Sequence, residues 1–600
     1  MSVFNKKKDG LEPPLDTITI LKEVPRRALR AARKEGEWYA VPAGWPLFKA
    51  GDVSDSIYFI LTGTFGAFRQ MPDGRDEFMG HIRAGEPAGE MALFQNGQSH
   101  GTADPPTDAF HSSSVYALRD SEVFKLSRKS FQKLINAEPE ILSGVIRLIV
   151  ARLKNGELRN PRTAPKVFSL VATSPSIDIG QRAQALATSL KRLNVRARIV
   201  FEDEGREKPA GFFDQLESEN DIVILVSTMG ENSWFKLAMR QADRIWVVAR
   251  ADARPSDPIF PKTSSPAQAM KLIDVLLIHY PGYRQASKPS DWLQAAGASR
   301  IFHWTNMMGE SSARLARTMA GRSVGVVLSG GGARAYAHIG AIRAIRELGI
   351  PVDFIGGTSM GAVIAACVAK GWDIQEIETR IRKAFVATNP LGDWHLPVVG
   401  LVKGRKVDAR LLEHFGNSEI NDLEIPFFAS STSLSTGLVR VHRSGSLRAA
   451  LRASISLPGI LPPVVEDDQI LVDGAVLNNF PADIMAKFHR GLTIGADVTR
   501  TDKGLKTESF IDPPGFFGWV ARHGLSSMPP IAELLMRSAT LTNDPTNGHE
   551  DVDALVLPEL GEIELRDWKA YDECVEAGYS AAMKALHNSG FVAQLNLVTG

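Results

Sequence analysis

Residues 323–334 read Ser-Val-Gly-Val-Val-Leu-Ser-Gly-Gly-Gly-Ala-Arg, and residues 357–361 read Gly-Thr-Ser-Met-Gly. The first stretch is an apolar strand that runs into a glycine-rich loop, and a helical pattern over residues 336–348 follows it. The second stretch is a G-x-S-x-G turn behind another short apolar strand, residues 352–355. Together they predict a strand–loop–helix–strand–turn unit of an α/β fold.

The G-x-S-x-G turn makes Ser359 a candidate nucleophile. A serine hydroxyl is a weak nucleophile, so it needs a neighbouring base, and the oxyanion that it creates needs fixed N–H donors. Gly357 and Gly361 permit the tight, strained turn that presents such a serine between a strand and a helix. Because so short a pattern also arises by chance, the neighbouring motifs have to support it.

The loop of Gly330, Gly331 and Gly332 lies between a buried strand and a helix. Successive glycines there let backbone N–H groups converge on an anion, which makes them candidate oxyanion donors. The alternative is a phosphate-binding loop, but the Lys-Ser/Thr ending of a P-loop is absent. A dinucleotide-binding loop would have glycine where this chain has Ala335. Arg334 either holds the loop or is an ordinary solvated arginine.

The candidate base is Asp473, which follows the apolar pair Leu471-Val472 and precedes Gly474. A partly buried carboxylate has a raised proton affinity and could take the serine proton directly. A strand-end aspartate before glycine is, however, also a common turn residue. Three histidines are rival bases, although a role as a polar helix residue or loop partner is simpler for each: His338, His395 and His442.

Taken in order, Gly-Gly-Gly-x-Arg, G-x-S-x-G and Asp-Gly-Ala resemble the signature of patatin-like phospholipases. Over about residues 323–498 the chain is similar to the neuropathy target esterase branch of that family. Two positions depart from the usual pattern, since Ala335 and Ala475 stand where glycines end the first and last motifs. The stretches that carry the resemblance to the branch are Ile350–Ser359, Arg440–His442, Gly445–Leu447, Arg452–Ser454, Leu461–Pro463 and Asn478–Asp483.

The resemblance implies a serine esterase that works through a Ser–Asp dyad rather than a triad. It implies that an acyl-enzyme forms and that a fatty acid is released from a phospholipid or lysophospholipid, with no cofactor or metal. The site residues that it implies are Ser359 as nucleophile, Asp473 as base, Gly330, Gly331, Gly332 and Arg334 as the oxyanion site, and Gly357, Gly361 and Gly474 as motif glycines.

The N-terminal part predicts a small barrel or jelly roll. Residues 18–127 carry short β-like runs between glycine turns, and one helix is expected over residues 128–153. Residues 48–52 and 56–63 resemble the cyclic nucleotide-binding β-roll.

Gly89 and Glu90 resemble the start of the phosphate-binding cassette of that β-roll. His111 stands where the family has the arginine that pairs with the cyclic phosphate. We therefore favour a structural or regulatory domain without ligand over binding of cAMP or cGMP. The alternative function is a cyclic-nucleotide-responsive regulatory protein in which hydrolysis is secondary.

A small, degenerate Rossmann-like α/β domain with a mostly parallel sheet is predicted next. The loop after its first strand, residues 173–178, has neither G-x-G-x-x-G nor a P-loop, which favours a structural or docking role. Residues 155–166 and 309–322 read as connectors. The expected strands are Val167–Ala172, Ala197–Phe201, Ile222–Val226, Arg244–Ala249 and Val275–His279, with helices Gln181–Leu193 and Trp234–Gln241 between them.

The chain is too long for a single core at 600 residues. We expect a multidomain α/β protein, with a patatin-like α/β hydrolase whose parallel-rich sheet is flanked by helices. The expected domains are a β-roll with a C-terminal helix over 18–154, the small α/β domain over 166–308, the catalytic domain over 323–498 and an extension over 499–600 that completes it.

Composition points to a cytoplasmic protein. The net charge of +1 gives no reason to expect a nucleic acid partner, and two cysteines cannot form a disulfide framework. No apolar stretch of about 18 residues is present, so membrane contact would be peripheral, at the inner face. The aromatic segment 510–520 could dip into a lipid headgroup region or pack on the protein's own core.

Overall fold

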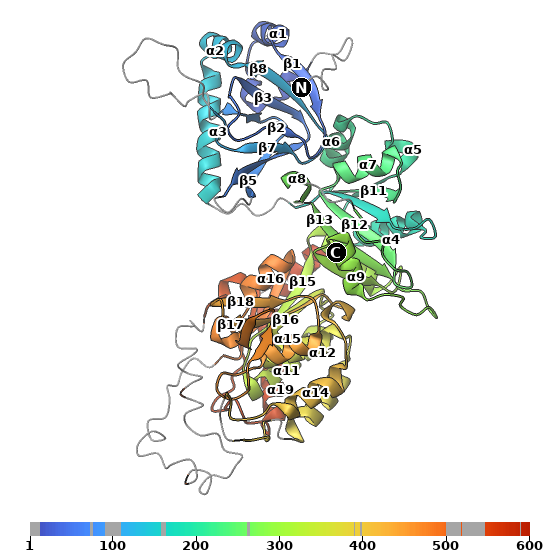
Figure 1. Ribbon diagram of the computed structural model, residues 1–600, viewed down its shortest axis with the longest axis vertical. Coiled ribbons are helices and arrows are strands. Elements are labelled where there is room, and N and C mark those ends of the chain that lie inside the picture. Colours follow the sequence, from blue (N-terminus) through green and yellow to red (C-terminus); the bar gives the residue numbers. More distant parts are fainter. Residues whose placement is uncertain are drawn as a thin grey trace.

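The computed structural model describes residues 13–71, 76–90, 110–157, 164–260, 265–269, 271–388, 391–395, 399–499, 546–588 and 590–599, with residues 518 and 534. Figure 1 shows three parts along the long axis: a β-roll at the top, a smaller α/β part, and a larger α/β part at the bottom. The expected fold class is confirmed. The candidate interfacial segment 510–520 lies outside the described residues, apart from Gly518.

The β-roll consists of two four-stranded antiparallel sheets, in the orders β1-β8-β3-β6 and β2-β7-β4-β5. Alternate residues of β3 and β8 face a core built around Ile57, Phe59 and Phe124, against which the flanking helices pack. The elements are α1 (Arg26–Glu35), β1 (Glu37–Val41), β2 (Pro46–Phe48), β3 (Ser56–Thr62), β4 (Thr64–Gln70), β5 (Asp76–Arg83), β6 (Pro87–Ala88), β7 (Ser114–Ala117) and β8 (Ser121–Ser127).

The single helix expected over residues 128–153 is wrong, because two helices cover this stretch. α2 (Arg128–Ala137) ends before Pro139, and α3 (Glu140–Glu157) begins after it. Proline has no N–H to continue a helix and forces the preceding residue out of the helical region. Glu138 accordingly has φ −135° and ψ 79°. The second helix also extends into the expected connector 155–166, as far as Glu157.

The small α/β part has an entirely parallel sheet of six strands, in the order β10-β11-β9-β12-β13-β14. Its central strands are mostly apolar and buried because helices cover both faces. The elements are β9 (Val167–Ala172), α4 (Ile179–Arg192), β10 (Ala197–Val200), α5 (Glu202–Gly205), α6 (Ala210–Glu219), β11 (Ile222–Thr228), α7 (Ser233–Gln241), β12 (Arg244–Arg250), α8 (Pro266–Ala269), β13 (Leu272–Ile278), α9 (Pro289–Ala296) and β14 (Arg300–Trp304).

The expected connector 309–322 is also wrong, since it forms helix α10 (Glu310–Ala320). The two glycines that suggested a connector flank this helix: Gly309 lies at its N-cap, and Gly321 closes its C-terminus in the left-handed conformation at φ 68°. α10 buries Leu315 and Met319 and packs against α4. The chain therefore enters the catalytic part from a packed helix.

The large α/β part has a mixed eight-stranded sheet with β15 near its centre, in the order β19-β20-β17-β16-β15-β21-β22, and β18 pairs with β17. Its strands are β15 (Ser323–Leu328), β16 (Phe354–Thr358), β17 (Phe427–Ser433), β18 (Leu438–His442), β19 (Val464–Glu466), β20 (Gln469–Asp473), β21 (Gly491–Ala496) and β22 (Ala554–Val556). Its helices are α11 (Ala337–Glu347), α12 (Met360–Ala369), α13 (Ile374–Ile381), α14 (Arg405–Phe415), α15 (Leu447–Ser454), α16 (Ala482–Phe488), α19 (Tyr571–Asn588) and α20 (Phe591–Thr599), with a π-helical turn η5 (Arg382–Val386) after α13.

Strand register brings the catalytic motifs to one edge of this sheet. β15 and β16 are parallel neighbours, so the glycine loop and the serine turn leave the sheet side by side. Thr358 at the end of β16 lies opposite Ser430 of β17, and the next residue, Ser431, lies opposite Asp473. β20 runs antiparallel to β17, and in this register Asp473, its last residue, lies level with the end of β16.

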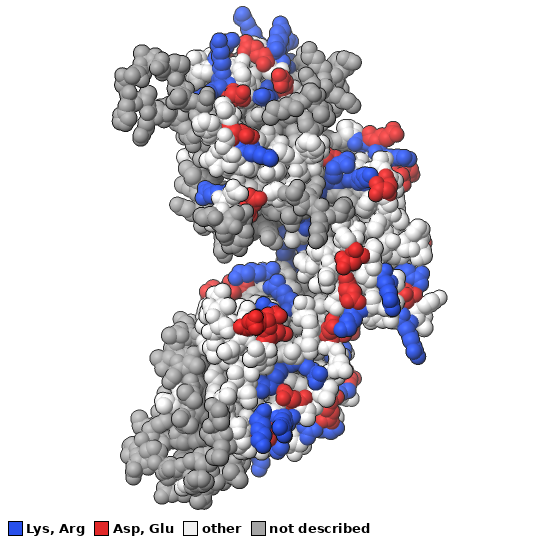
Figure 2. Space-filling model, in the orientation of Figure 1, with Lys and Arg blue, Asp and Glu red and all other residues white. Residues whose placement is uncertain are grey.

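Among the described helices, none is both long enough and apolar enough to cross a membrane. Figure 2 shows lysine and arginine side chains interspersed with aspartate and glutamate over the face that it presents.

A buried arginine joins the β-roll to the small α/β part. Arg119, in the turn between β7 and β8, donates to the carboxylates of Asp243 and Glu217. Asp243 also accepts from the backbone N–H groups of Lys166 and Val167, at 2.9 and 3.0 Å. Burial disfavours the charged form of Asp243, but Arg119 and these N–H groups outweigh it and hold its pKa below the ordinary value.

Replacement of Arg119 should therefore loosen this joint. Breaking a fully buried ion pair costs about 3–5 kcal/mol of stability. Because about a quarter of each acidic side chain is exposed, we expect Arg119→Ala to lower the free energy of unfolding by roughly 2 kcal/mol. Urea unfolding of the whole chain measures this loss. Arg27→Ala, at an exposed position on α1, is the matched control. Equal unfolding midpoints for the two variants would contradict the structural role of the joint.

Candidate active site

Ser359 occupies a strained turn between β16 and α12. Its backbone has φ 55° and ψ −130°, a region that residues other than glycine rarely adopt. Such strain costs about 1–3 kcal/mol and clusters at active sites. A Cβ on Gly361 would lie 2.3 Å from the carbonyl oxygen of Ser329. Glycine is therefore required there for the loop after β15 to approach the serine turn.

Ser359 and Asp473 are in direct contact. Ser359 Oγ donates to Asp473 Oδ2 at 2.7 Å, and Asp473 Oδ1 accepts from the backbone N–H of Ala475 at 2.9 Å. Asp473 is fully buried. Burial raises the pKa of Asp473 to about 7, against the opposing effect of the two hydrogen bonds. This carboxylate is thus a stronger base than an exposed aspartate.

Polar side chains that the sequence analysis did not single out fix the backbone of the serine turn. Ser454 Oγ, at the end of α15, accepts from the Ser359 N–H at 2.8 Å. Thr358 Oγ1 lies 2.5 Å from Ser430 Oγ and donates to the Asn478 carbonyl at 3.0 Å. Ser454 and Asn478 belong to stretches that carry the family resemblance, and that resemblance was the only sequence signal for them.

The glycine loop lies against the serine. A Cβ on Gly330 would come within 3.0 Å of Ser359 Cβ. The Gly330 N–H donates to the Asn479 carbonyl at 3.1 Å, whereas the N–H groups of Gly331 and Gly332 have no acceptor among the described residues. Within the described part of the chain, the loop that reaches Ser359 through Gly330 therefore carries two unpaired donors.

Arg334 anchors this loop from behind. Its side chain is buried, with Nε donating to the Val498 carbonyl and Nη1 to the Ile563 carbonyl, both at 2.9 Å. Gly332, at φ +55°, would place a Cβ 2.3 Å from the Leu565 carbonyl oxygen. Of the two interpretations of Arg334, the solvated one is wrong and the loop-holding one is confirmed.

None of the rival histidines is hydrogen-bonded to Ser359. His338 Nε2 lies 2.8 Å from the Ser329 carbonyl oxygen, and His442 Nε2 lies 2.8 Å from Ser431 Oγ. Burial lowers the pKa of both to about 4, so both are neutral. His395 lies in a loop, where its backbone N–H donates to the Leu401 carbonyl.

The β-roll residues of the cyclic-nucleotide-like pocket are packed together. The His111 ring stacks on Phe48, with centroids 3.6 Å apart and planes at 12°. A Cβ on Gly89 would lie 3.3 Å from the His111 ring, and Glu90 is buried. Burial lowers the pKa of His111, so it offers no fixed positive charge in place of the family arginine.

Three family models match consecutive parts of the chain. Residues 40–138 match the cyclic nucleotide-binding domain, residues 177–324 the Neuropathy Target Esterase (NTE) family P-loop-like domain, and residues 326–486 patatin-like phospholipase.

Relatives extend this similarity over nearly the whole chain. An uncharacterized NTE family protein of Mycobacterium tuberculosis is 32% identical, covering 95% of this chain and 96% of that protein. Lysophospholipase nte1 of Aspergillus niger is 26% identical over 91% of this chain, which spans 41% of the fungal protein. Among solved structures, Thermus thermophilus catabolite activator protein matches with TM-score 0.20 and 20% identity, covering 29% of this chain and 70% of that one.

The buried carboxylate of Asp473 should lower the stability of the native state at neutral and alkaline pH. Its folded-state pKa of about 7 lies above the ordinary value of 3.8. As pH rises from about 4, the unfolded chain ionises first, so stability falls until about pH 7 and stays lowered above it. The free energy of unfolding of Asp473→Asn should therefore exceed that of wild type by roughly 1–4 kcal/mol at pH 8, and should equal it at pH 4.

Urea unfolding at both pH values measures this difference. Asp468→Asn, the same change at an exposed position, is the control and should show no such gain. A gain of equal size at pH 4 and pH 8 would show that the carboxylate is not its source.

Proposed function

The chain belongs to the neuropathy target esterase family of patatin-like phospholipases, and we propose that it hydrolyses carboxylic ester bonds of phospholipids or lysophospholipids through Ser359 and Asp473. The observation that carries this proposal is the 2.7 Å hydrogen bond between Ser359 Oγ and a fully buried carboxylate. A carboxylate with a pKa of about 7 suits proton transfer near neutral pH.

The reaction proceeds in two halves. Asp473 takes the Ser359 hydroxyl proton as Oγ attacks the ester carbonyl carbon, and the tetrahedral intermediate collapses by passing that proton to the departing alcohol. Water then attacks the acyl-enzyme and gives a proton to Asp473. Collapse of this second intermediate returns the proton to Ser359 Oγ and releases the fatty acid.

The oxyanion of each intermediate requires preorganised donors. The N–H groups of Gly331 and Gly332 supply them, because they have no acceptor among the described residues. Gly330 and Arg334 act as positioning residues, since their own donors are engaged with the carbonyls of Asn479, Val498 and Ile563.

The lysophospholipid substrate is proposed from the fungal relatives named lysophospholipases. Such a substrate leaves a bilayer, so we propose peripheral contact with a membrane. The cyclic-nucleotide-responsive alternative is less well supported. His111 is neutral and stacked on Phe48, whereas a cyclic phosphate needs a cationic partner in that place.

Ser359→Ala and Asp473→Asn should each abolish hydrolysis of lysophosphatidylcholine and of p-nitrophenyl butyrate. Loss of the nucleophile or base removes a step that contributes about a factor of 100 to 10,000 or more. Initial rates on both substrates, with folding checked by circular dichroism, measure the effect.

The matched control for this experiment is a rival base. His442→Gln keeps a hydrogen-bonding side chain beside Ser431 and should retain wild-type rates. If His442→Gln were inactive while Asp473→Asn kept its activity, histidine would be the base and the dyad would be excluded.

The dyad also predicts the pH dependence of the reaction. Asp473 must be ionised to accept the serine proton, so kcat/KM for p-nitrophenyl butyrate should fall as pH drops through about 7, tenfold per pH unit below it. If Asp473 had an ordinary pKa, kcat/KM would instead stay the same from pH 8 down to about pH 5. A flat profile over that range would remove the buried carboxylate from the mechanism.

A further inference from the structure

The glycine loop that carries the proposed oxyanion donors is held by Asn479, which lies just before α16. The Gly330 N–H donates to the Asn479 carbonyl at 3.1 Å, and Asn479 Nδ2 donates back to the Gly330 carbonyl at 3.2 Å. A Cβ on Gly330 would also come within 2.5 Å of Asn479 Oδ1 and 3.0 Å of Ser359 Cβ. Asn479 therefore joins the first glycine of the loop in both directions, at the point where the loop reaches Ser359.

The side-chain amide of Asn479 is itself held by a chain of hydrogen bonds. Asn479 Nδ2 donates to Thr499 Oγ1 at 2.7 Å, and Thr499 Oγ1 donates to Asp497 Oδ1 at 2.5 Å. Asp497 Oδ1 also accepts from the Thr499 backbone N–H at 2.9 Å, and Asp497 Oδ2 lies 2.9 Å from His549 Nε2. Asp497 directly follows β21 and is 4% exposed. Four side chains from three segments of the chain thus form one connected network that ends at the loop.

The direction of each hydrogen bond in this network follows from its chemistry. A carboxylate only accepts, so the hydroxyl hydrogen of Thr499 and the Nε2 hydrogen of His549 both point to Asp497. A hydroxyl has one hydrogen, so Thr499 Oγ1 can then only accept from Asn479. The two hydrogens of Asn479 Nδ2 are used by Thr499 Oγ1 and by the Gly330 carbonyl. Asp497 therefore determines which way the amide of Asn479 faces.

The loop needs an anchor of this kind. Gly331 and Gly332 have no side chains, and glycine is the most conformationally free residue, so nothing within this pair keeps its two N–H groups aligned. Arg334 holds the loop on the C-terminal side of the pair through two backbone carbonyls. On the N-terminal side, Gly330 is held by Asn479. Anchors on both sides leave the pair little freedom, which is the preorganisation that oxyanion donors require.

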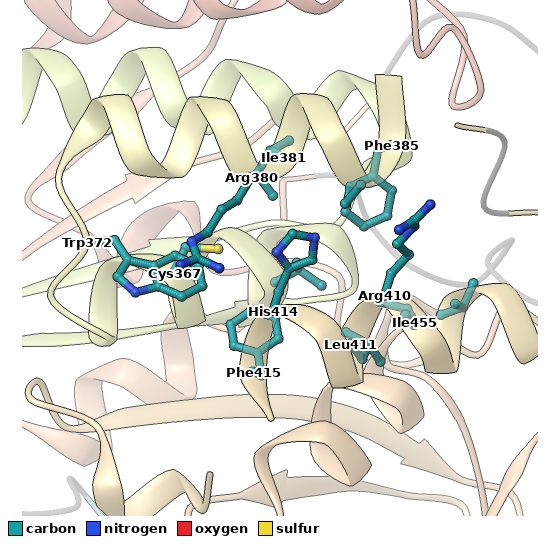
Figure 3. Close-up of a pocket in the computed structure, with 13 residues that line it drawn as sticks. Cys367, Trp372, Arg380, Ile381, Phe385, Arg410, Leu411, His414, Phe415 and Ile455 are labelled. Atoms are coloured by element: carbon teal, nitrogen blue, oxygen red, sulfur yellow. The ribbon is translucent and has the colours of Figure 1, made fainter. Parts of the chain in front are cut away.

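A small apolar pocket in the same part of the molecule gives the loop no support. Figure 3 shows this pocket between α12, α13 and α14, and it has room for about one water. Neither Ser359, Asp473 nor the glycines of the loop line it. The polar network around Asn479, in contrast, is bonded directly to the loop.

We propose that Asn479 is a positioning residue for the oxyanion loop, and that Asp497 orients Asn479 through Thr499. The inference rests on the proposed function of Ser359. The network acts on the donors of the loop and not on the binding of the ester. Its loss should therefore lower kcat and leave KM close to the wild-type value, and a misplacement of about 1 Å in such a site can cost roughly 100-fold in rate.

Thr499 offers a matched pair of variants. Thr499→Val keeps the shape of the side chain but removes the hydroxyl that connects Asn479 to Asp497, whereas Thr499→Ser keeps the hydroxyl. For p-nitrophenyl butyrate we expect Thr499→Val to lower kcat by about tenfold or more with little change in KM. Thr499→Ser should keep the wild-type kcat. Equal kcat values for the two variants would overturn the proposal.

A double-mutant cycle tests whether Thr499 acts through Asn479. Asn479→Ala should lower kcat by about 100-fold, the loss expected when an oxyanion donor is no longer held in place. Adding Thr499→Val to Asn479→Ala should cost nothing further, because the amide that the hydroxyl orients is already gone. Losses that multiply in the double variant would show that Thr499 acts by another route, and would contradict the proposal.

Inhibition by an alkyl trifluoromethyl ketone isolates the oxyanion donors. Ser359 Oγ adds to the ketone carbon, its proton passes to Asp473, and the former carbonyl oxygen takes the negative charge that the loop stabilises. The inhibition constant should rise in Thr499→Val by the same factor as kcat/KM falls. An unchanged inhibition constant beside a lowered kcat would contradict a role in holding the oxyanion donors.

Hydrogen–deuterium exchange of the whole chain separates these results from failure of the proposed function. The amides of residues 329–336 should exchange faster in Thr499→Val and Asn479→Ala than in wild type or Thr499→Ser, whether or not esters are hydrolysed. Exchange in the β-roll should not change, which checks the fold. Equal exchange over residues 329–336 in all four proteins would overturn the proposal. If wild type hydrolysed no ester while exchange responded as expected, the dyad would fail and the anchoring of the loop would stand.

Discussion

The site depends on one interaction, the hydrogen bond from Ser359 to the carboxylate of Asp473, which is held away from water. Desolvation makes Asp473 a stronger base than an exposed aspartate, which is what the proposed dyad needs to work without histidine. The same desolvation makes its charge costly to bury, and among the described residues only Ala475 and Ser359 donate to it. The carboxylate is therefore effective only if its two donors are held at fixed distances.

Strand register and close backbone packing provide that fixed geometry. Asp473 ends β20 opposite Ser431, one residue beyond the Thr358–Ser430 pair that precedes the nucleophile. α12 begins directly after Ser359, and all of its residues are buried. The strain at Ser359 is thus balanced by a helix packed on every side, and by the bond from its N–H to Ser454. Small residues at Gly361 and Gly474 bring the neighbouring backbones close enough for these contacts.

The sequence predicted what depends on local patterns and fell short where packing decides. Alternating apolar runs and glycine turns located the sheets, and the motif residues Ser359 and Asp473 are in contact across 114 positions of sequence. Pro139 should have divided the helix after the β-roll, and the glycines around α10 were caps rather than signs of a connector. No pattern marks Ser454 as the partner of the Ser359 N–H.

Two carboxylates also connect the three parts of the chain, Asp243, which is mostly buried, and Asp353, which is fully buried, and each binds both an arginine and a backbone N–H. Asp243 binds Arg119 of the β-roll and accepts the N–H of Val167, which begins β9. Asp353 binds Arg317 of α10 and accepts the N–H of Val324, at the start of β15. Buried ion pairs add little net stability, because desolvation offsets their attraction, but they tolerate few alternative geometries. Since β15 ends in the glycine loop beside Ser359, the pairing that orients α10 also fixes the strand that carries the proposed oxyanion donors. The position of the catalytic site within the chain is therefore set by charge pairing at its base as well as by apolar packing around it.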